Sequence, residues 1–171
     1  MVFKTSYNSA LGVPVIGQVD ATELYPIGTV IKGFDETQGE GEFIYLPGAA
    51  NVAEGSCVVY DLLPSAPAIA LADTDTAAQL HSGRPIAWAM GAIVADKFGW
   101  FQISGLVKAA GIAGGAAGIA HLTATAGAVD DTDIAGGQIA GAYISSAIDT
   151  PSAGFILSGA TFKRVAPFAF S

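Results

Sequence analysis

The pattern of hydrophobic positions is clearest over residues 84–108 (RPIAWAMGAIVADKFGWFQISGLVK), where two apolar runs flank a polar turn. In the second run, 100–107, aromatic and β-branched side chains recur with a period of two, which predicts a β-strand. In the first run, 86–94, large residues alternate with Ala and Gly, which is typical of a strand with one crowded face. The segment is therefore expected to form a buried β-hairpin, with Trp88 and Trp100 in the core.

Similar short runs of branched and aromatic residues recur along the chain, each bounded by Gly, Pro, Asn or Asp. Further strands are predicted at 29–32, 42–46, 56–62, 68–72, 119–124, 138–144 and 154–163. The segment 73–80 (DTDTAAQL) favours a brief helix, because Asp or Thr can cap the residues that follow. The number and spacing of the strands predict an all-β fold, an antiparallel barrel or sandwich of short strands.

The two ends of the chain lack such a pattern. Residues 1–26 show no sustained period and predict an extended N-terminal arm; 27–166 form the β domain, and 167–171 (PFAFS) form a C-terminal tail. An arm of this kind stays disordered or lies across a neighbouring subunit, and its β-branched residues favour the second. The apolar side chains of the arm and tail that we expect to contact a partner are Val13, Val15, Ile16, Val19, Phe168 and Phe170.

Charge narrows the class of protein. Charged residues make up 13% of the chain, about half of the usual share, so we expect much of the surface to be covered by other proteins. The net charge of −8 argues against direct packing on nucleic acid, whose phosphates would repel it. The uncharged stretch 109–129 is rich in Gly and poor in large aliphatic residues, so no membrane-spanning helix is expected, and residues 1–12 lack the apolar core of an export signal.

The residues that most often carry chemistry are few. His81 and His121 have no second His or Cys at metal-ligand spacing, and Cys57 lies in an apolar run typical of a core position. Neither a nucleophile elbow nor a phosphate-binding loop is present. We therefore expect no enzymatic activity and no cofactor.

Two acidic clusters require a choice between a cation site and a turn. They are formed by Asp73 with Asp75, and by Asp130, Asp131 and Asp133. Closely spaced carboxylates can hold a hard cation such as Ca²⁺, but Asp and Thr are also common turn and capping residues. The turn interpretation is favoured because neither cluster has the long loop with a closing Glu of an EF-hand.

Several segments resemble a known group of proteins. They are 25–29 (YPIGT), 41–48 (GEFIYLPG), 55–61 (GSCVVYD), 84–87 (RPIA) and 95–105 (ADKFGWFQISG). In this order they resemble small structural proteins of tailed bacteriophages, and in particular capsid decoration, or cement, proteins. The resemblance covers about residues 25–165, and its motifs are turns and strands with no functional residue to carry over. It implies a mostly β protein on the outside of the virion head, assembled in the host cytoplasm, bound to the major capsid protein and often trimeric.

Two hypotheses of function follow. The first is a decoration protein that bridges capsid subunits and reinforces the shell against the pressure of the packaged DNA. The second is a receptor- or glycan-binding module of a phage head or tail fibre, in which Trp88, Trp100 or Tyr143 would have to be exposed for stacking on sugars. Large residues at alternating strand positions belong more often to a core, which favours the first hypothesis.

Overall fold

The computed structural model describes residues 4–5, 14–35, 39–63, 67–73, 84–145 and 155–158. The helices and strands of these ranges are all β-strands, joined by turns and irregular segments: β1 Lys4–Thr5, β2 Val19–Asp20, β3 Val30–Asp35, β4 Gly39–Pro47, β5 Cys57–Asp61, β6 Ala68–Leu71, β7 Ile86–Ala89, β8 Phe98–Ala109, β9 Gly118–Leu122, β10 Val129–Asp130, β11 Gln138–Ile144 and β12 Phe155–Ser158. Every pair of these strands is antiparallel, so the predicted all-β antiparallel fold is confirmed. None of the described segments is a helix that could cross a bilayer. The brief helix predicted over 73–80 lies, beyond its first residue, outside the described ranges.

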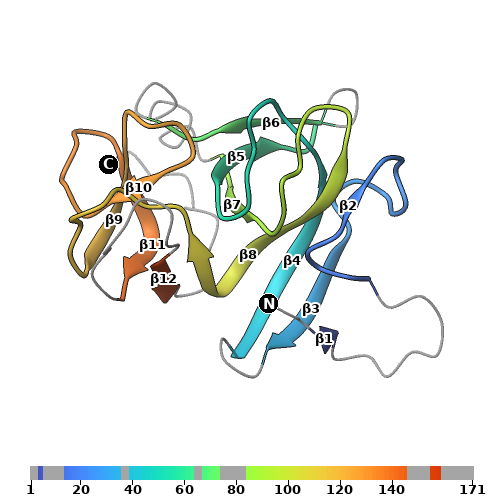
Figure 1. The fold of residues 1–171 in the computed structure, drawn as a ribbon, viewed down its shortest axis with the longest axis horizontal. Coiled ribbons are helices and arrows are strands. Elements are labelled where there is room, and N and C mark those ends of the chain that lie inside the picture. The colour runs from blue at the N-terminus through green and yellow to red at the C-terminus, as the bar shows by residue number, and fades with distance from the viewer. Residues whose placement is uncertain are drawn as a thin grey trace, which may run out of the picture.

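The strands form two packed sheets that share β8 (Figure 1). Its first part, 98–105, pairs with β4, and β2 and β7 also pair with this part of the strand. Its last four residues, 106–109, pair with β12, which continues through β11 and β9 to β10. The predicted hairpin is confirmed, since Trp88 of β7 lies opposite Gln102 of β8.

A β-bulge interrupts β8 where it passes from one sheet to the other. Glu42 of β4 lies opposite Ser104, but the next residue, Phe43, lies opposite Gln102, which leaves Ile103 as the extra residue. A bulge of this kind bends a strand and raises its twist. It lets one continuous strand serve two sheets.

The side chain of Gln102, at the bulge, donates hydrogen bonds to two backbone carbonyl groups further along β8. This side chain is fully buried, and its Nε2 donates to the carbonyl oxygens of Ser104 at 2.9 Å and Leu106 at 2.8 Å. Space for the amide comes from Gly41, where a Cβ would lie 2.9 Å from Gln102 Nε2. Gly105 follows with φ +93°, a conformation that side chains rarely adopt.

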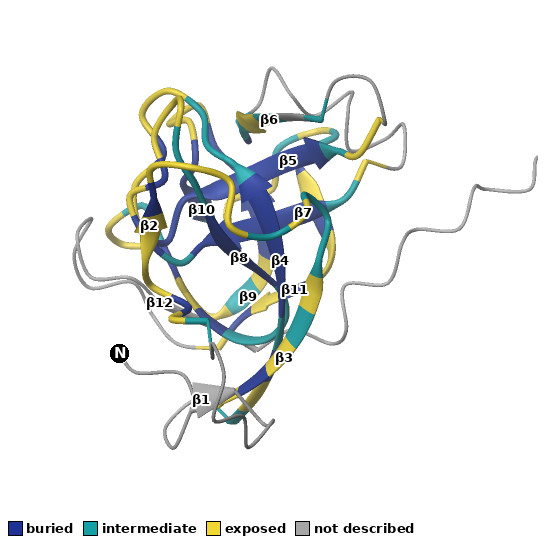
Figure 2. Ribbon diagram, turned by 90° about the vertical axis from the view of Figure 1, so that its right-hand side faces the viewer, coloured by how far each residue is buried: buried dark blue, intermediate teal, exposed yellow. Residues whose placement is uncertain are grey.

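Buried residues gather on the strands at the centre of the molecule (Figure 2), and the core clusters contain both tryptophans. Trp88 is fully buried among residues of both sheets, including Leu122 and Ile139. Trp100 is 1% exposed and packs with Phe43 in a second cluster. The prediction that both tryptophans belong to the core is confirmed.

Part of the predicted N-terminal arm belongs to this core. Residues 14–26 contain turns and bends and the two strand residues of β2, and they lie against the chain's own sheet: β2 pairs with β8, and Ile16 is 2% exposed. The pairing places Val19 opposite Gly99, where a Cβ would lie 3.2 Å from the carbonyl oxygen of Gln18. Residues 6–13 and the tail 167–171 lie outside the described ranges.

Candidate functional site

The predicted partner-binding residues have different placements. Val15 and Val19 are 62% and 38% exposed, so their side chains are available at the surface. Ile16 is not available, because it is buried with Trp100 in the chain's own core; as a contact to a partner it is therefore corrected to a core residue. Val13, Phe168 and Phe170 lie outside the described residues.

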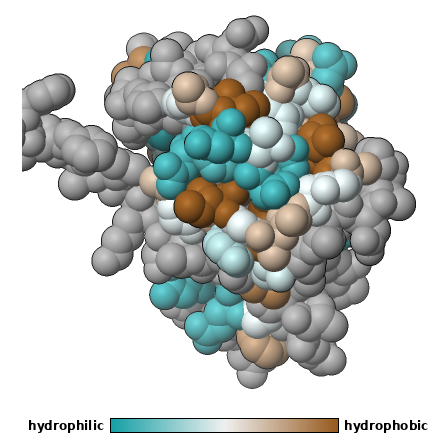
Figure 3. Space-filling model, turned by 90° about the vertical axis from the view of Figure 1, so that its left-hand side faces the viewer, coloured by the Kyte–Doolittle hydropathy of each residue, from teal (hydrophilic) through white to brown (hydrophobic). Residues whose placement is uncertain are grey.

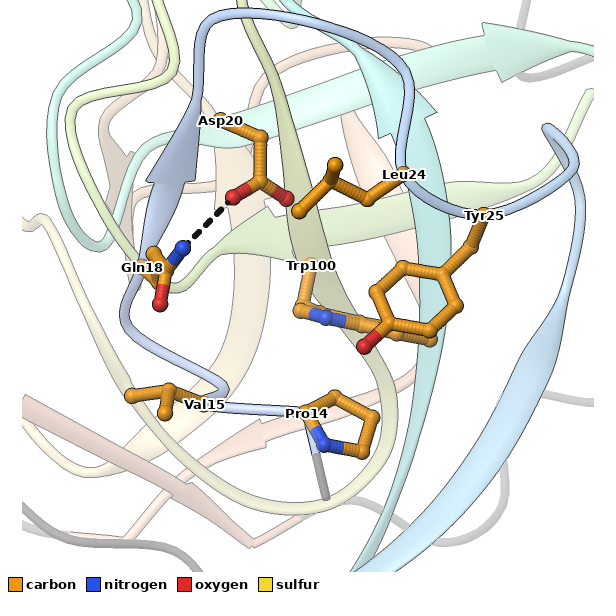
Figure 4. A pocket seen from close by; sticks show the side chains of 7 residues that line it. All are labelled: Pro14, Val15, Gln18, Asp20, Leu24, Tyr25 and Trp100. Atoms are coloured by element: carbon orange, nitrogen blue, oxygen red, sulfur yellow. Dashed lines mark hydrogen bonds between the residues drawn. The ribbon is translucent and has the colours of Figure 1, made fainter. Parts of the chain in front are cut away.

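The N-terminal segment, defined here as residues 14–25, encloses a small pocket against β8 (Figure 4). The cavity has a volume of about 70 Å³, and its lining residues are Pro14, Val15, Gln18, Asp20, Leu24, Tyr25 and Trp100. At roughly 30 Å³ per water molecule, this is room for about two waters or one small polar group.

The pocket combines an aromatic wall with an apolar rim. Trp100 and Tyr25 lie with their ring centroids 5.3 Å apart, and Tyr45 packs against both at 5.1 and 5.2 Å. Val15 and Leu24 are 62% and 57% exposed, so aliphatic side chains border the mouth. The pocket thus opens to the surface between two apolar side chains.

A buried carboxylate lies at the pocket. Asp20 is 5% exposed; its Oδ1 accepts a hydrogen bond from Gln18 Nε2 at 2.8 Å, and its Oδ2 accepts one from the Tyr45 hydroxyl at 2.8 Å. The backbone N–H of Leu24 donates to the Tyr45 hydroxyl at 3.3 Å. Two of these bonds join the middle and the end of the N-terminal segment, at Asp20 and Leu24, to Tyr45 of β4.

The environment of Tyr45 also changes its acidity. Burial, followed by the hydrogen bond to the Asp20 carboxylate and the charges of Asp20 and Glu23, raises the pKa of Tyr45 to about 12, although the Leu24 N–H acts in the opposite direction. The phenol therefore stays protonated, and continues to donate to Asp20, at pH values well above the ordinary pKa of tyrosine.

The acidic residues at 130–133 form a turn on the β9–β11 side of the molecule. Asp131 Oδ1 accepts the N–H of Ala116 at 2.9 Å, and this bond holds the pKa of Asp131 below its ordinary value. Asp130 accepts from the N–H of Asp131 and from the Thr132 hydroxyl, both at 2.9 Å. The two bonds of Asp130 are local, as in a turn, whereas the bond of Asp131 reaches a residue 15 positions earlier. The turn interpretation stays a prediction.

The same turn comes close to one histidine. His121 is 6% exposed, and its Nδ1 lies 3.6 Å from Asp133 Oδ1. Figure 3 shows hydrophilic side chains gathered at the centre of this face, with hydrophobic ones around them. No group of three or more potential metal ligands occurs in the part of the chain that the structure describes, which includes Asp73 but not Asp75.

Cys57 is a core residue. Its side chain is fully buried, and burial raises the pKa of its thiol well above the ordinary value. A thiol in this state is a poor nucleophile and a poor metal ligand.

Large hydrophobic side chains are exposed on several parts of the surface. Those exposed by more than a third are Val15, Val19, Leu24, Val30, Phe34, Leu62, Leu63, Val94, Ile119 and Tyr143. The N-terminal segment carries three of them within ten residues. Ile119 and Tyr143 lie opposite each other on β9 and β11 and form a second, smaller pair.

Comparisons of the chain with protein-family models, with curated proteins and with solved structures find no match.

Asp20, Gln18 and Leu24 could not have been recognised as site residues from the sequence. Asp20 follows a stretch without a hydrophobic period, where an acidic residue is normally solvated. Its hydrogen-bond partner Tyr45 is 25 positions away, so no local motif connects the two. The only signal was the cluster of apolar residues around them, which identified Val15 and Val19.

Proposed function

We propose that this protein is a capsid decoration protein, which binds the outer surface of the major capsid protein lattice and reinforces the head of a tailed bacteriophage. The proposal starts from the resemblance of residues 25–165 to such proteins. The observation that carries it further is the surface of the N-terminal segment, where Val15, Val19 and Leu24 are exposed on a backbone fixed to the sheet.

Exposed aliphatic side chains on a fixed backbone favour binding to another protein, because little conformational entropy is lost when they are buried. Burial of apolar surface contributes about 25 cal/mol per Å² removed from water. Many copies of a decoration protein bind to identical sites of one head. Each copy therefore needs to contribute only a modest free energy to the stability of the whole head. A chain with 13% charged residues suits a surface that is covered in this way.

The alternative, a receptor- or glycan-binding module, required exposed aromatic residues that could stack on sugars, and most of the candidates are buried. Trp88 and Trp100 are 0% and 1% exposed, so neither indole can stack on a sugar. Tyr143 alone is exposed, at 47%, and one tyrosine beside Ile119 is a small platform. The decoration hypothesis is therefore the one we retain.

The test uses point substitutions, because deletion of residues 1–20 would also remove the core residue Ile16. The double variant Val15→Asp, Val19→Asp places two charges on the exposed face of the N-terminal segment and leaves Ile16 and Asp20 in place. Purified protein is added to phage heads that lack it, and the bound amount is measured by gel densitometry and cryo-EM. Ile119→Asp on β9 is the matched control for an added charge at an exposed aliphatic position.

We expect the wild type and Ile119→Asp to bind with a copy number comparable to that of the major capsid protein, and the double variant to bind much less. Wild-type binding at only a few copies per particle would favour a fibre module instead. Equal binding of all three proteins would exclude the N-terminal segment as the docking face. Absence of binding by the folded wild type would refute the decoration function.

A further inference from the structure

We propose that the pocket under the N-terminal segment binds a cationic side chain, a lysine or arginine, presented by the partner protein. The identity of the partner rests on the proposed function, whereas the chemistry of the pocket rests on Asp20, Trp100 and Tyr25 alone. Nothing in the sequence pattern or the resemblance assigns this site.

The first argument is the state of Asp20. Its carboxylate is 5% exposed, yet both of its hydrogen-bond donors, Gln18 and Tyr45, are neutral. Within the described ranges, no lysine, arginine or histidine forms an ion pair with it. Burial of a carboxylate without an opposite charge is costly, and an incoming cation would offset that cost.

The second argument is that each carboxylate oxygen keeps acceptor capacity. Oδ1 and Oδ2 each accept a single hydrogen bond from the described part of the chain, and an ionised carboxylate has about four acceptor positions in all. Figure 4 shows the Asp20 carboxylate between Gln18 and Leu24, on the same side of the segment as Trp100. An ammonium or guanidinium group in the pocket can therefore bond to Asp20 without displacing Gln18 or Tyr45.

The third argument is the aromatic wall. The rings of Trp100 and Tyr25 line the cavity, but Trp100 is 1% exposed and packed by Tyr25 and Tyr45. The partly exposed ring of Tyr25 is therefore the one that an entering cation can contact, and cations bind favourably to the faces of such rings. A hard metal ion would be a poor occupant, because it requires six or more oxygen ligands and the lining holds a single carboxylate. An organic cation suits the combination of one carboxylate with an accessible aromatic ring.

The residues at the mouth of the pocket indicate whether its occupant is a free cation or a side chain. Val15 and Leu24 border the mouth and are largely exposed, so they offer a surface for the methylene stem of a lysine or arginine. The net charge of −8, with Glu23 close enough to act on Tyr45, attracts a basic partner to this region. We therefore assign the pocket to a basic side chain that enters from the surface.

The first experiment tests the pocket by itself. Nα-acetyl-lysine amide and Nα-acetyl-arginine amide, whose side chains are cationic, are titrated into the protein. The indole N–H of Trp100 and the side-chain amide of Gln18 are followed by NMR. We expect saturable shifts with these probes, weaker ones with free ammonium and guanidinium ions, and none with the neutral N-acetyl-norleucine amide or N-acetyl-citrulline amide. Equal shifts with the neutral probes, or no shifts at all, would overturn the proposal.

Two pairs of variants locate the effect. Asp20→Asn should weaken binding of the cationic probes at least about tenfold, because it removes a charge-assisted hydrogen bond. The control Glu54→Gln removes an exposed charge elsewhere and should leave binding unchanged. Val15→Lys places an ammonium group at the rim and should block the probes, whereas Val30→Lys adds the same charge at another exposed site and should not. If Asp20→Asn does not fold, the comparison of Val15→Lys with Val30→Lys provides the test. Equal effects of these two variants on probe binding would refute the proposed cation site.

Binding to phage heads separates this inference from the proposed function. If wild type and Val30→Lys occupy the heads, and neither Val15→Lys nor Asp20→Asn does, a basic side chain of the capsid is the occupant. If Val15→Lys occupies them equally, the capsid partner is excluded as the source of the cation while the decoration function stands. If the wild type binds the probes but not the heads, the decoration function fails and the pocket chemistry remains.

Discussion

Replacement of Gly105 by alanine tests how one strand can serve two sheets. Gly105 has φ +93° and lies at the end of the part of β8 that pairs with β4, just before the residues that pair with β12. A Cβ built there would lie 2.3 Å from the carbonyl oxygen of Glu40 and 3.0 Å from the Cα of Gly41. Alanine is therefore opposed both by the backbone conformation and by the neighbouring strand.

The two costs can be separated within this chain. Gly114 has nearly the same conformation, φ +90°, but a Cβ there would have nothing within 4 Å. Alanine at Gly114 should cost only the conformational term, about 1–2 kcal/mol. At Gly105 a clash with backbone is added, and overpacking of this kind costs about 1–3 kcal/mol more.

Urea unfolding followed by tryptophan fluorescence provides the assay, because both tryptophans are buried and report on the core. We expect Gly105→Ala to lower the free energy of unfolding by about 2–5 kcal/mol, and Gly114→Ala by about 1–2 kcal/mol. Equal losses in the two variants would show that the close contact with Glu40 carries no energetic weight. The argument for a sterically required kink in β8 would then be refuted.

Three further predictions concern buried polar groups. Because the pKa of Tyr45 is raised to about 12, its contribution to stability is complete below pH 10 and is lost as the pH rises from 10 to 12. Unfolding titrations should show a larger loss over this range in the wild type than in Tyr45→Phe, which keeps the loss due to Cys57. Gln102→Leu removes the donor to two backbone carbonyl groups and should lower the free energy of unfolding by about 2–4 kcal/mol, whereas Gln138→Leu at an exposed strand position should change it by less than about 0.5 kcal/mol. Cys57 should react with a chromogenic disulfide reagent only in denaturant, and rapid labelling of the native protein would contradict its burial.

The fold class and the central hairpin could be predicted because they depend on local periodicity. The alternation over 100–107 and the large–small pattern over 86–94 each identify a strand, and two such runs around a short turn pair with each other. The same local signals gave β4, β5 and β11 with boundaries close to those observed. Burial of Trp88 and Trp100 followed from their place in this hairpin.

The division of β8 between two sheets could not be predicted, because it depends on contacts that are distant in the sequence. Gln102 alternates correctly for a strand residue, and nothing in the local pattern distinguishes it from a solvent-facing amide. Its burial requires Gly41, 61 positions earlier, to leave the space that its amide occupies. The bulge and the kink at Gly105 follow from that pairing.

The N-terminal segment shows the same limit from the functional side. Its apolar residues were recognised, but the sequence could not show that Ile16 is turned inward while Val15 and Val19 remain outside. That difference is set by the pairing of β2 with β8 and by the hydrogen bond between Asp20 and Tyr45. A pattern of apolar residues can therefore identify a binding segment without identifying the side chains that bind.

The hydrogen bonds that hold the N-terminal segment to the sheet also build the candidate site, so binding and local stability are coupled. Asp20 fixes the segment through neutral donors and keeps a charge that the described part of the chain leaves without an opposite charge. A cationic occupant would bind the folded segment and not the detached one, and by mass action it must stabilise the attached state. A decoration protein built in this way would hold its docking surface more firmly once bound than before, because the partner would supply the opposite charge that Asp20 lacks within the described residues.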